Sequence, residues 1–188
     1  MSGARRVLVV AATAQELAPQ LDARTLCCGV GPVEAAARTA TAIASERPDL
    51  VLHVGIAGAR RHLGLAAGAL VLGTSSRYSD LAVPASLAPA ELFAPAALVE
   101  AIARAFPDAY QCGIGTSARV GGTTDCDVEA MEGFAVLRAA ALAGVPAIEV
   151  RTISNAIEEQ DRARWSFATA FAAITAATPR LVEALQRA

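Results

Sequence analysis

The chain has 188 residues, of which 54% are hydrophobic and 18% are charged, and its formal net charge is −2. This composition excludes a disordered chain, and the lack of a basic run argues against nucleic acid as a partner. Every apolar run is interrupted by Gly, Arg or Glu well short of a membrane span, so we expect no association with a membrane. At this length we expect residues 1–188 to form a single domain with its own core.

The residue types that the chain lacks limit its chemistry. It has no lysine, which removes a P-loop lysine and any Schiff-base or pyridoxal chemistry. Its two histidines, His53 and His62, are too few for a multi-histidine metal site, and its four cysteines form no CxxC pair. We therefore expect reduced thiols, no metal and no organic cofactor.

Along the chain, the hydrophobic pattern predicts strands that alternate with helices. The first apolar run, Arg6–Ala12, leads directly into Gln15 and Glu16, so we interpret it as a strand rather than a signal peptide and expect a cytoplasmic protein. Further strands are predicted at residues 25–30, 49–58, 69–76, 111–117 and 147–154. Helices are predicted at residues 32–46, 95–106, 128–143 and from 164 to the end, with a break at Thr178-Pro179.

This alternation is typical of a layered α/β fold with a largely parallel sheet. In such sheets, ligands bind beyond the carboxyl ends of the strands. The segments that follow or lie near these ends are polar or rich in glycine: ATAQE, GVGP, GIAGA, GGTTD and SNAIEE. We expect the site where these loops meet.

Several residues near that edge are candidate site residues, and most have a plain structural alternative. The glycines of VGIAGA (residues 54–59) would let backbone approach a bulky ligand, or they would form an ordinary turn. Glu16 either acts on a ligand or stabilises a helix start through the helix dipole. Glu132 is harder to explain structurally, because Met131 and Phe134 beside it look buried and a buried carboxylate needs a partner.

Other candidates are weaker. Asn155 ends a strand and either contacts a ligand or caps a turn, and His53 lies in an apolar strand where a core histidine is the usual interpretation. GVGPVE (residues 29–34) lacks the third glycine of a dinucleotide-binding fingerprint, so binding of NAD is disfavoured.

Five motifs together resemble one family. VVAATAQEL, CGVGPVEAA, VGIAGA, VEAMEGFAVLRAAALAGVP and RTISN occur in the order and spacing of the purine nucleoside phosphorylase/nucleosidase superfamily. The resemblance covers most of the chain, and the MEG and TISN motifs are specific. It implies a three-layer nucleoside phosphorylase/hydrolase-like α/β fold, with a central mixed, largely parallel sheet flanked by helices. Within the superfamily, the chain is most similar to the futalosine hydrolases, which are nucleosidases of a menaquinone pathway. The motifs that favour this branch are GVGPV, VGIAGA and ISN.

The resemblance also implies roles for individual residues. Glu16 matches the family glutamate that positions and deprotonates the attacking water. Glu132 matches the glutamate that accepts hydrogen bonds from the ribose hydroxyls, and its place at a helix start is expected to favour its ionised form. Met131 is expected to pack against the sugar. The remaining residues expected to bind substrate are Gly55, Ile56, Ala57 and Gly58.

Asn155 stands where adenosine-type nucleosidases carry aspartate. Its amide offers both a donor and an acceptor, which suits a 6-oxopurine and indicates hypoxanthine as the leaving base. The expected reaction is hydrolysis of the N-ribosidic bond of futalosine, which releases hypoxanthine and dehypoxanthine futalosine in menaquinone biosynthesis. The expected partner is a small-molecule nucleoside, and the resemblance favours a homo-oligomer, a dimer or higher.

Three alternatives stay open. Asn155 argues against a methylthioadenosine/S-adenosylhomocysteine nucleosidase. Ile56 and His53 argue against a purine nucleoside phosphorylase, because they stand where phosphorylases carry phosphate-binding residues. Glu16 argues against a non-catalytic nucleoside-binding protein, which needs no base. The chain also departs from the family: a hairpin before GVGP is missing, the region 81–95 is short, and Glu129 in VEAMEG is given no role.

Overall fold

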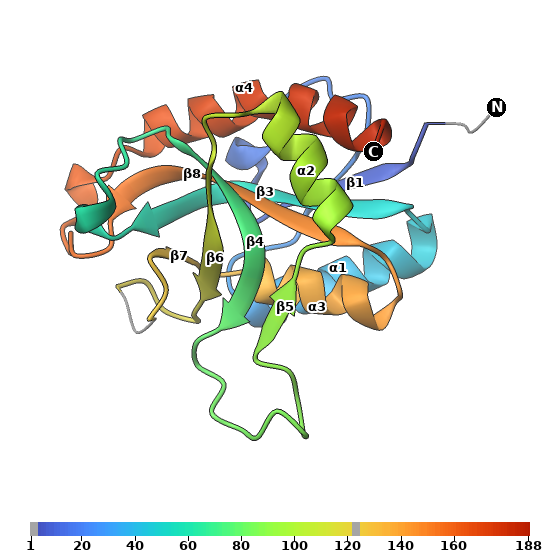
Figure 1. The fold of residues 1–188 in the computed structure, drawn as a ribbon, viewed down its shortest axis with the longest axis horizontal. Coiled ribbons are helices and arrows are strands. Elements are labelled where there is room, and N and C mark those ends of the chain that lie inside the picture. Colours follow the sequence, from blue (N-terminus) through green and yellow to red (C-terminus); the bar gives the residue numbers. More distant parts are fainter. Residues whose placement is uncertain (1–3, 122–124) are drawn as a thin grey trace.

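A mixed β-sheet runs through the middle of the molecule (Figure 1). The computed structural model describes residues 4–121 and 125–188. The strands within these residues are β1 (Val7–Ala11), β2 (Arg24–Cys27), β3 (Leu50–Ala59), β4 (Leu70–Tyr78), β5 (Glu91–Phe93), β6 (Tyr110–Thr116), β7 (Val128–Ala130) and β8 (Ala147–Ala156). Their order is β2-β1-β3-β7-β6-β4-β5, and β8 pairs with both β3 and β4. Most pairings are parallel, whereas β3–β7, β4–β5 and β4–β8 are antiparallel. The predicted mixed, largely parallel sheet is confirmed.

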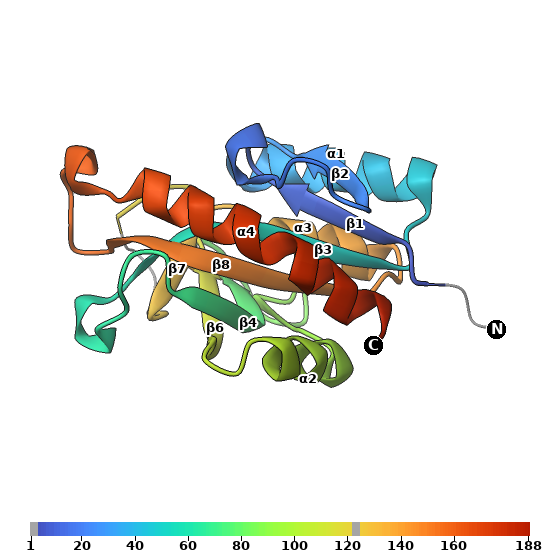
Figure 2. The same ribbon diagram turned by 90° about the horizontal axis from the view of Figure 1, so that it is seen from above.

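Helices cover both faces of this sheet (Figure 2). One face carries α1 (Pro32–Glu46) and α3 (Gly133–Leu142), which contact each other, and the other carries α2 (Ala96–Ala105) and α4 (Phe167–Gln186). Short 3-10 helices also occur: η1 (Ala14–Glu16), η2 (Arg61–Leu63) and η3 (Arg162–Arg164). The three-layer fold implied by the resemblance is confirmed.

The alternation of side chains along the central strands divides the core in two. Val9 and Leu52 lie in the cluster that packs against α2 and α4. Val10 and Val51, their neighbours in sequence, lie in the cluster that packs against α1 and α3. Each strand face therefore belongs to a defined helix layer, which decides where any polar residue on that strand comes to lie.

Five strands form a closed ring in the order β3-β8-β4-β6-β7, because β7 pairs with β3 and β8 pairs with β4. Small and branched side chains such as Ala57, Ile114 and Ile153 fill its interior. Within the ring, β3 and β8 run in parallel from the Val51–Ala147 pair to the Ala59–Ala156 pair. This pairing brings the VGIAGA and RTISN motifs side by side, although about 95 residues separate them in the chain.

The predicted helix at residues 128–143 is only partly correct. Val128–Ala130 form β7, and the helix begins at Gly133. Val128 pairs with Ile114 of β6 and with Ala59 of β3, and its side chain is buried inside the ring. Long-range strand pairing thus overrides the local helical pattern, and Glu129 belongs to a strand rather than to a helix start.

The predicted break at Thr178-Pro179 is wrong. Helix α4 continues through Pro179, and the Thr178 hydroxyl donates to the carbonyl of Ile174 at 2.7 Å. Leu181 and Leu185 beyond the proline pack in the same core cluster as Ile174 before it. Because both halves bury side chains against one sheet face, packing offsets the backbone hydrogen bond that the proline lacks.

No helix within the described residues combines the length and the apolar character needed to cross a membrane.

Candidate active site

A cavity of about 530 Å³ opens at the carboxyl ends of β1, β3 and β8. Its volume lies in the usual range for sites that bind small molecules. Its lining comes from five segments of the chain: Ala12, Thr13, Gln15 and Glu16; Val30; Ile56, Ala57 and Gly58; Val120, Glu129, Ala130, Met131 and Glu132; and Ser154, Asn155, Arg162, Trp165, Phe167 and Phe171. These segments include most of the predicted loops. Residues 122–124 of the GGTTD segment lie outside the described residues.

Glu16 ends η1, immediately after β1, and is 4% exposed. Its Oε2 accepts hydrogen bonds from the backbone N–H of Thr13 at 2.8 Å and from the Thr13 hydroxyl at 2.9 Å. Its Oε1 accepts from the backbone N–H of Ile56 at 3.2 Å. Three donors therefore hold the carboxylate at the cavity wall in one orientation, and Oε1 keeps one lone pair for a ligand or a water.

Three of the four predicted residues of the VGIAGA motif, Ile56, Ala57 and Gly58, line the cavity, whereas Gly55 does not. A Cβ atom on Gly55 would collide with the guanidinium of Arg151 and would lie 2.8 Å from Oε1 of Glu16. Gly55 thus lies behind the cavity wall, where the absence of a side chain leaves room for these two charged groups.

Asn155 reaches the cavity through an irregularity in β8. Ala57 pairs with Ile153 but Gly58 pairs with Asn155, so Ser154 is the extra residue of a β-bulge. Oδ1 of Asn155 accepts from the Ser154 hydroxyl at 2.7 Å, and Nδ2 donates to the carbonyl of Ala156 at 2.9 Å. These contacts orient the amide, and they leave one N–H and one lone pair for a ligand.

Glu132 immediately precedes α3 and is 4% exposed. Its Oε1 accepts from the backbone N–H of Gly31 at 3.0 Å. Gly31 has a φ of +89°, which favours glycine, and this conformation belongs to the predicted GVGP turn. Oε2 of Glu132 lies 3.6 Å from Nη2 of Arg151. The carboxylate thus already has a donor and a cation, and Met131 beside it lines the cavity.

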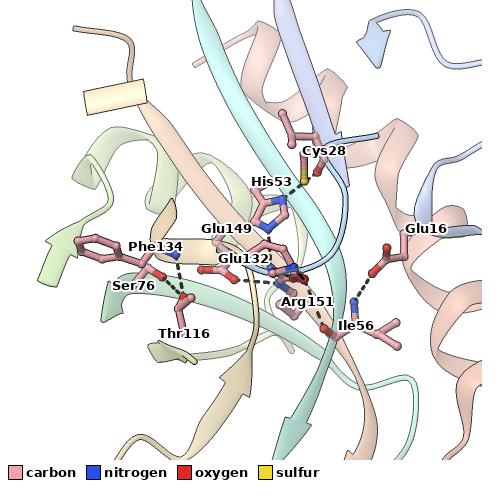
Figure 3. Close-up of polar contacts among 12 residues, drawn as sticks. Glu16, Cys28, His53, Ile56, Ser76, Thr116, Glu132, Phe134, Glu149 and Arg151 are labelled. Carbon is pink, nitrogen blue, oxygen red and sulfur yellow. Dashed lines mark hydrogen bonds and ion pairs between the residues drawn. The ribbon is translucent and has the colours of Figure 1, made fainter. Parts of the chain in front are cut away.

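Arg151 is the centre of a buried charge cluster (Figure 3). It is 1% exposed. Its Nε donates to Oε1 of Glu149 at 2.8 Å, and its Nη2 contacts both Glu132 and Nε2 of His53. Nδ1 of His53 lies 2.9 Å from the carbonyl of Val10, which can only accept, so the proton is on Nδ1 and Nε2 accepts from Arg151. His53 is therefore a core histidine that supports the cluster from behind.

The electrostatics of this cluster follow from its burial. Burial lowers the pKa of His53 well below its usual value, and the charge of Arg151 lowers it further, so the imidazole is neutral. Burial would lower the pKa of Arg151 too, but Glu149, Glu132 and Glu16 raise it above its usual value. Burial raises the pKa of Glu132, against the opposing effects of Arg151 and the Gly31 N–H. The expected effect of the helix start on Glu132 is therefore outweighed by desolvation.

Glu149 is fully buried, and its carboxylate fills the space beside the Cα atom of Gly133. Its Oε2 has no hydrogen-bond partner among the described residues. The sequence interpretation missed both Glu149 and Arg151, although a signal was present. They stand two apart in the apolar run AIEVRTIS, so they share one face of a buried strand.

Two further observations limit the chemistry of the site. The described residues contain no cluster of three or more His, Cys, Asp or Glu side chains that could hold a metal ion. The four cysteines are free, and burial raises the pKa of the Cys28 and Cys112 thiols to about 12. A thiolate nucleophile at either position is therefore disfavoured.

Comparisons with known proteins place this geometry in a wider context. A family model described as the Phosphorylase superfamily matches residues 20–187. The futalosine hydrolase of Streptomyces coelicolor is 36% identical in an alignment that covers 86% of this chain and 79% of that protein.

Solved structures with the same fold have much lower identity. A 5′-methylthioadenosine/S-adenosylhomocysteine nucleosidase from Colwellia psychrerythraea, in complex with adenine, matches with a TM-score of 0.84 at 19% identity, covering 97% of this chain and 96% of that chain. The futalosine hydrolase of Helicobacter pylori matches with a TM-score of 0.79 at 14% identity, covering 97% of each chain.

Proposed function

Because this chain belongs to the Phosphorylase superfamily, we propose that it is a nucleosidase that hydrolyses the N-ribosidic bond of futalosine and releases hypoxanthine and dehypoxanthine futalosine. The observation that carries the proposal is that Glu16, Glu132 and Asn155, contributed by three distant segments, line one cavity. The 36% identity to the futalosine hydrolase of Streptomyces coelicolor supports the choice of substrate.

Glu16 is the proposed general base. Cleavage of a ribosyl–purine bond passes through an oxocarbenium-like centre, which a water molecule must attack. Because Thr13 and Ile56 hold the Glu16 carboxylate, it can accept a proton from a water without first reorganising. Gly55 contributes by leaving space for this carboxylate.

Glu132 and Met131 are the proposed ribose-binding residues. Glu132 uses one lone pair of Oε1 for the N–H of Gly31, and Oε2 faces Arg151. Each oxygen can accept one more hydrogen bond, which matches the two vicinal hydroxyls of a ribose. Ile56, Ala57 and Gly58 supply the wall against which the nucleoside lies.

Hydrolysis, rather than phosphorolysis, is favoured by the charges of the site. Glu16, Glu129 and Glu132 line the cavity and would repel a phosphate ion, and the N–H of Ile56 is already bonded to Glu16. The test is to incubate the protein with futalosine in phosphate-free buffer and to identify the products. We expect hypoxanthine and a free ribose-type product at the same rate as with phosphate. Strict dependence on phosphate, with a ribose-1-phosphate product, would overturn the proposal.

The base is expected to be selected through Asn155. Its free N–H can donate to the 6-oxo group of hypoxanthine, whereas the 6-amino group of adenine would meet it donor to donor. Such a mismatch costs about 1–3 kcal/mol, or roughly tenfold to a hundredfold in kcat/KM. We expect the native protein to prefer futalosine to aminofutalosine by this factor, and Asn155→Asp to narrow or reverse the preference. A native preference for aminofutalosine, or a ratio that the substitution leaves unchanged, would show that Asn155 does not read the base.

Glu132 is expected to recognise the ribose hydroxyls. The loss of a hydrogen bond to a charged group costs about 1.5–3 kcal/mol, so Glu132→Ala should lower kcat/KM for futalosine roughly tenfold to a hundredfold. The native protein should discriminate against a 2′-deoxy substrate by a similar factor, and Glu132→Ala should lose much of this discrimination. If the native protein cleaves ribo and 2′-deoxyribo substrates equally well, the assignment of Glu132 fails.

The wider setting of the enzyme is also proposed. We propose one nucleosidase domain over residues 1–188 that acts in menaquinone biosynthesis in the cytoplasm, where its free cysteines would stay reduced. Exposed apolar side chains such as Phe93 and Leu142 favour a homo-oligomer, a dimer or higher. Light scattering on the purified protein tests the assembly, and a monomer at micromolar concentration would contradict it.

A further inference from the structure

One part of the cavity is left unused by the proposed chemistry at the base and the ribose. It is a wall formed by Trp165, Phe167 and Phe171, with Arg162 beside them, and is called the aromatic wall below. The ring centroids of Trp165 and Phe167 lie 5.4 Å apart, and those of Phe167 and Phe171 lie 6.1 Å apart with nearly parallel planes. Three adjacent rings provide a broad apolar surface for a flat group of a ligand.

Acidic and basic side chains line different parts of the cavity. Glu16, Glu129 and Glu132 are the acidic residues that line it. Within the described residues, Arg162 is the one basic residue that lines it. Arg151 lies behind the wall, where Glu149 and Glu132 already balance its charge. Among the described residues, a negatively charged group on a ligand therefore finds a cationic side chain only at the aromatic wall.

Arg162 is held in a position suited to such a group. Its Cζ atom lies 5.2 Å from the ring centroid of Trp165 and 5.9 Å from that of Phe167. The indole N–H of Trp165 donates to the carbonyl of Glu159 at 3.0 Å, which fixes the ring. A guanidinium stacked on a ring keeps its N–H edge free for the bidentate bonds that carboxylates form.

The neighbouring arginine shows the contrast. Nη1 of Arg164 lies 3.7 Å from Oε2 of Glu159, and its Nε lies 3.8 Å from Oδ2 of Asp161. The side chain of Arg164 does not line the cavity. Among the described residues, no carboxylate lies within ion-pairing distance of Arg162. Of these two arginines of η3, Arg162 is thus the one available to a ligand.

We propose that Arg162 is a specificity-determining residue that binds a carboxylate on the 5′ substituent of the substrate, while the aromatic wall packs against the flat part of that substituent. The inference rests on the proposed function, which places the base at Asn155 and the 2′ and 3′ hydroxyls at Glu132. With these positions occupied, C5′ is the carbon of the ribose from which a substituent can extend to the rest of the cavity. An aryl carboxylate matches both the rings and the charge.

A matched pair of substrates tests this proposal. The pair is 5′-deoxy-5′-(3-carboxyphenylthio)inosine and its carboxamide, which differ in charge but hardly in shape. We expect the native protein to favour the acid by roughly tenfold to a hundredfold in kcat/KM, mainly through KM because the contact lies far from the bond that breaks. Arg162→Gln should bring the ratio of kcat/KM for the acid to kcat/KM for the amide near one, and Arg162→Lys should keep part of the native preference. The control Arg164→Gln should leave this ratio unchanged.

The outcome can be separated from a failure of the proposed function. If neither compound is cleaved, calorimetry still measures whether the acid binds more tightly than the amide and whether Arg162→Gln removes the difference. A native ratio near one, or a ratio that Arg162→Gln does not change, would overturn the role of Arg162. Acceleration of hypoxanthine release by orthophosphate that depends on Arg162 would also overturn it, because Arg162 would then bind a co-substrate.

Discussion

Replacing Glu16 by glutamine is expected to slow futalosine turnover by about 10²–10⁴-fold, which is the usual contribution of a general base. Glutamine keeps the size of the side chain, and its one amide oxygen can still accept from Thr13, whereas the NH2 that replaces the other oxygen cannot accept from Ile56. It cannot take a proton from water. The measurement is single-turnover release of hypoxanthine, together with the binding of free hypoxanthine, which should survive.

Glu129 offers a matched control for this experiment. It lines the same cavity and is 6% exposed, close to the 4% of Glu16. Its Oε1 accepts from the N–H of Gly121 at 3.0 Å, and no catalytic role is assigned to it. We expect Glu129→Gln to lose less than about tenfold in rate, below the range of a lost general base. Near-normal turnover in Glu16→Gln, or an equal loss in both variants, would show that Glu16 is not the base.

Replacing Arg151 by methionine is expected to reduce the free energy of unfolding by about 3–5 kcal/mol, because it leaves buried carboxylates without their cation. Glu149 loses the donor to its Oε1, and Glu132 loses the charge that faces its Oε2. Chemical denaturation measures the change. The control is Arg104→Met, since Arg104 forms a surface pair with Glu100 that is about 70% exposed on both sides, and such pairs contribute less than about 1 kcal/mol.

The deficit of Arg151→Met should depend on pH. Burial raises the pKa of Glu132 and Arg151 lowers it, so removal of Arg151 raises it further. A carboxyl whose pKa is higher in the folded chain than in the unfolded chain stabilises the fold at low pH, and this contribution is lost as the pH rises through the folded value. The deficit should therefore be larger at pH 8 than at pH 5. A deficit that is independent of pH would mean that lost packing, rather than unpaired charge, causes the destabilisation.

Local sequence patterns predict the place of some site residues but not of others. Glu16 and Asn155 each follow or end a predicted strand, and parallel strands present such residues at one edge, whereas their roles in the reaction are implied by the family resemblance alone. Gly55 is expected at the same edge, but it lies behind the wall because the side chains of Arg151 and Glu16 occupy the space beside it. A strand pattern indicates which residues share a face of the sheet. It does not indicate which side chains of neighbouring elements occupy the space beside them.

The aromatic wall was missed for a different reason. Trp165 and Phe171 follow the last strand at spacings that are typical of ordinary core residues. Arg162 stands among several charged residues and has no local mark that separates it from Arg164. Its position over Trp165 depends on the turn of η3 and on the packing of α4 beside β8, where Thr152 donates to the carbonyl of Ala170.

The sequence by itself determined the alternation of strands and helices, the layered α/β class, and the positions of Glu16 and Asn155 near the carboxyl ends of strands, because periodicity and glycine turns are local properties. The tertiary structure alone decided that Val128–Ala130 join the sheet, that α4 continues through Pro179, and that Arg151 lies between Glu149, His53 and Glu132. Each of these depends on contacts between residues far apart in the chain. Strand pairing and burial against a distant element contribute more free energy than the local preference that they override.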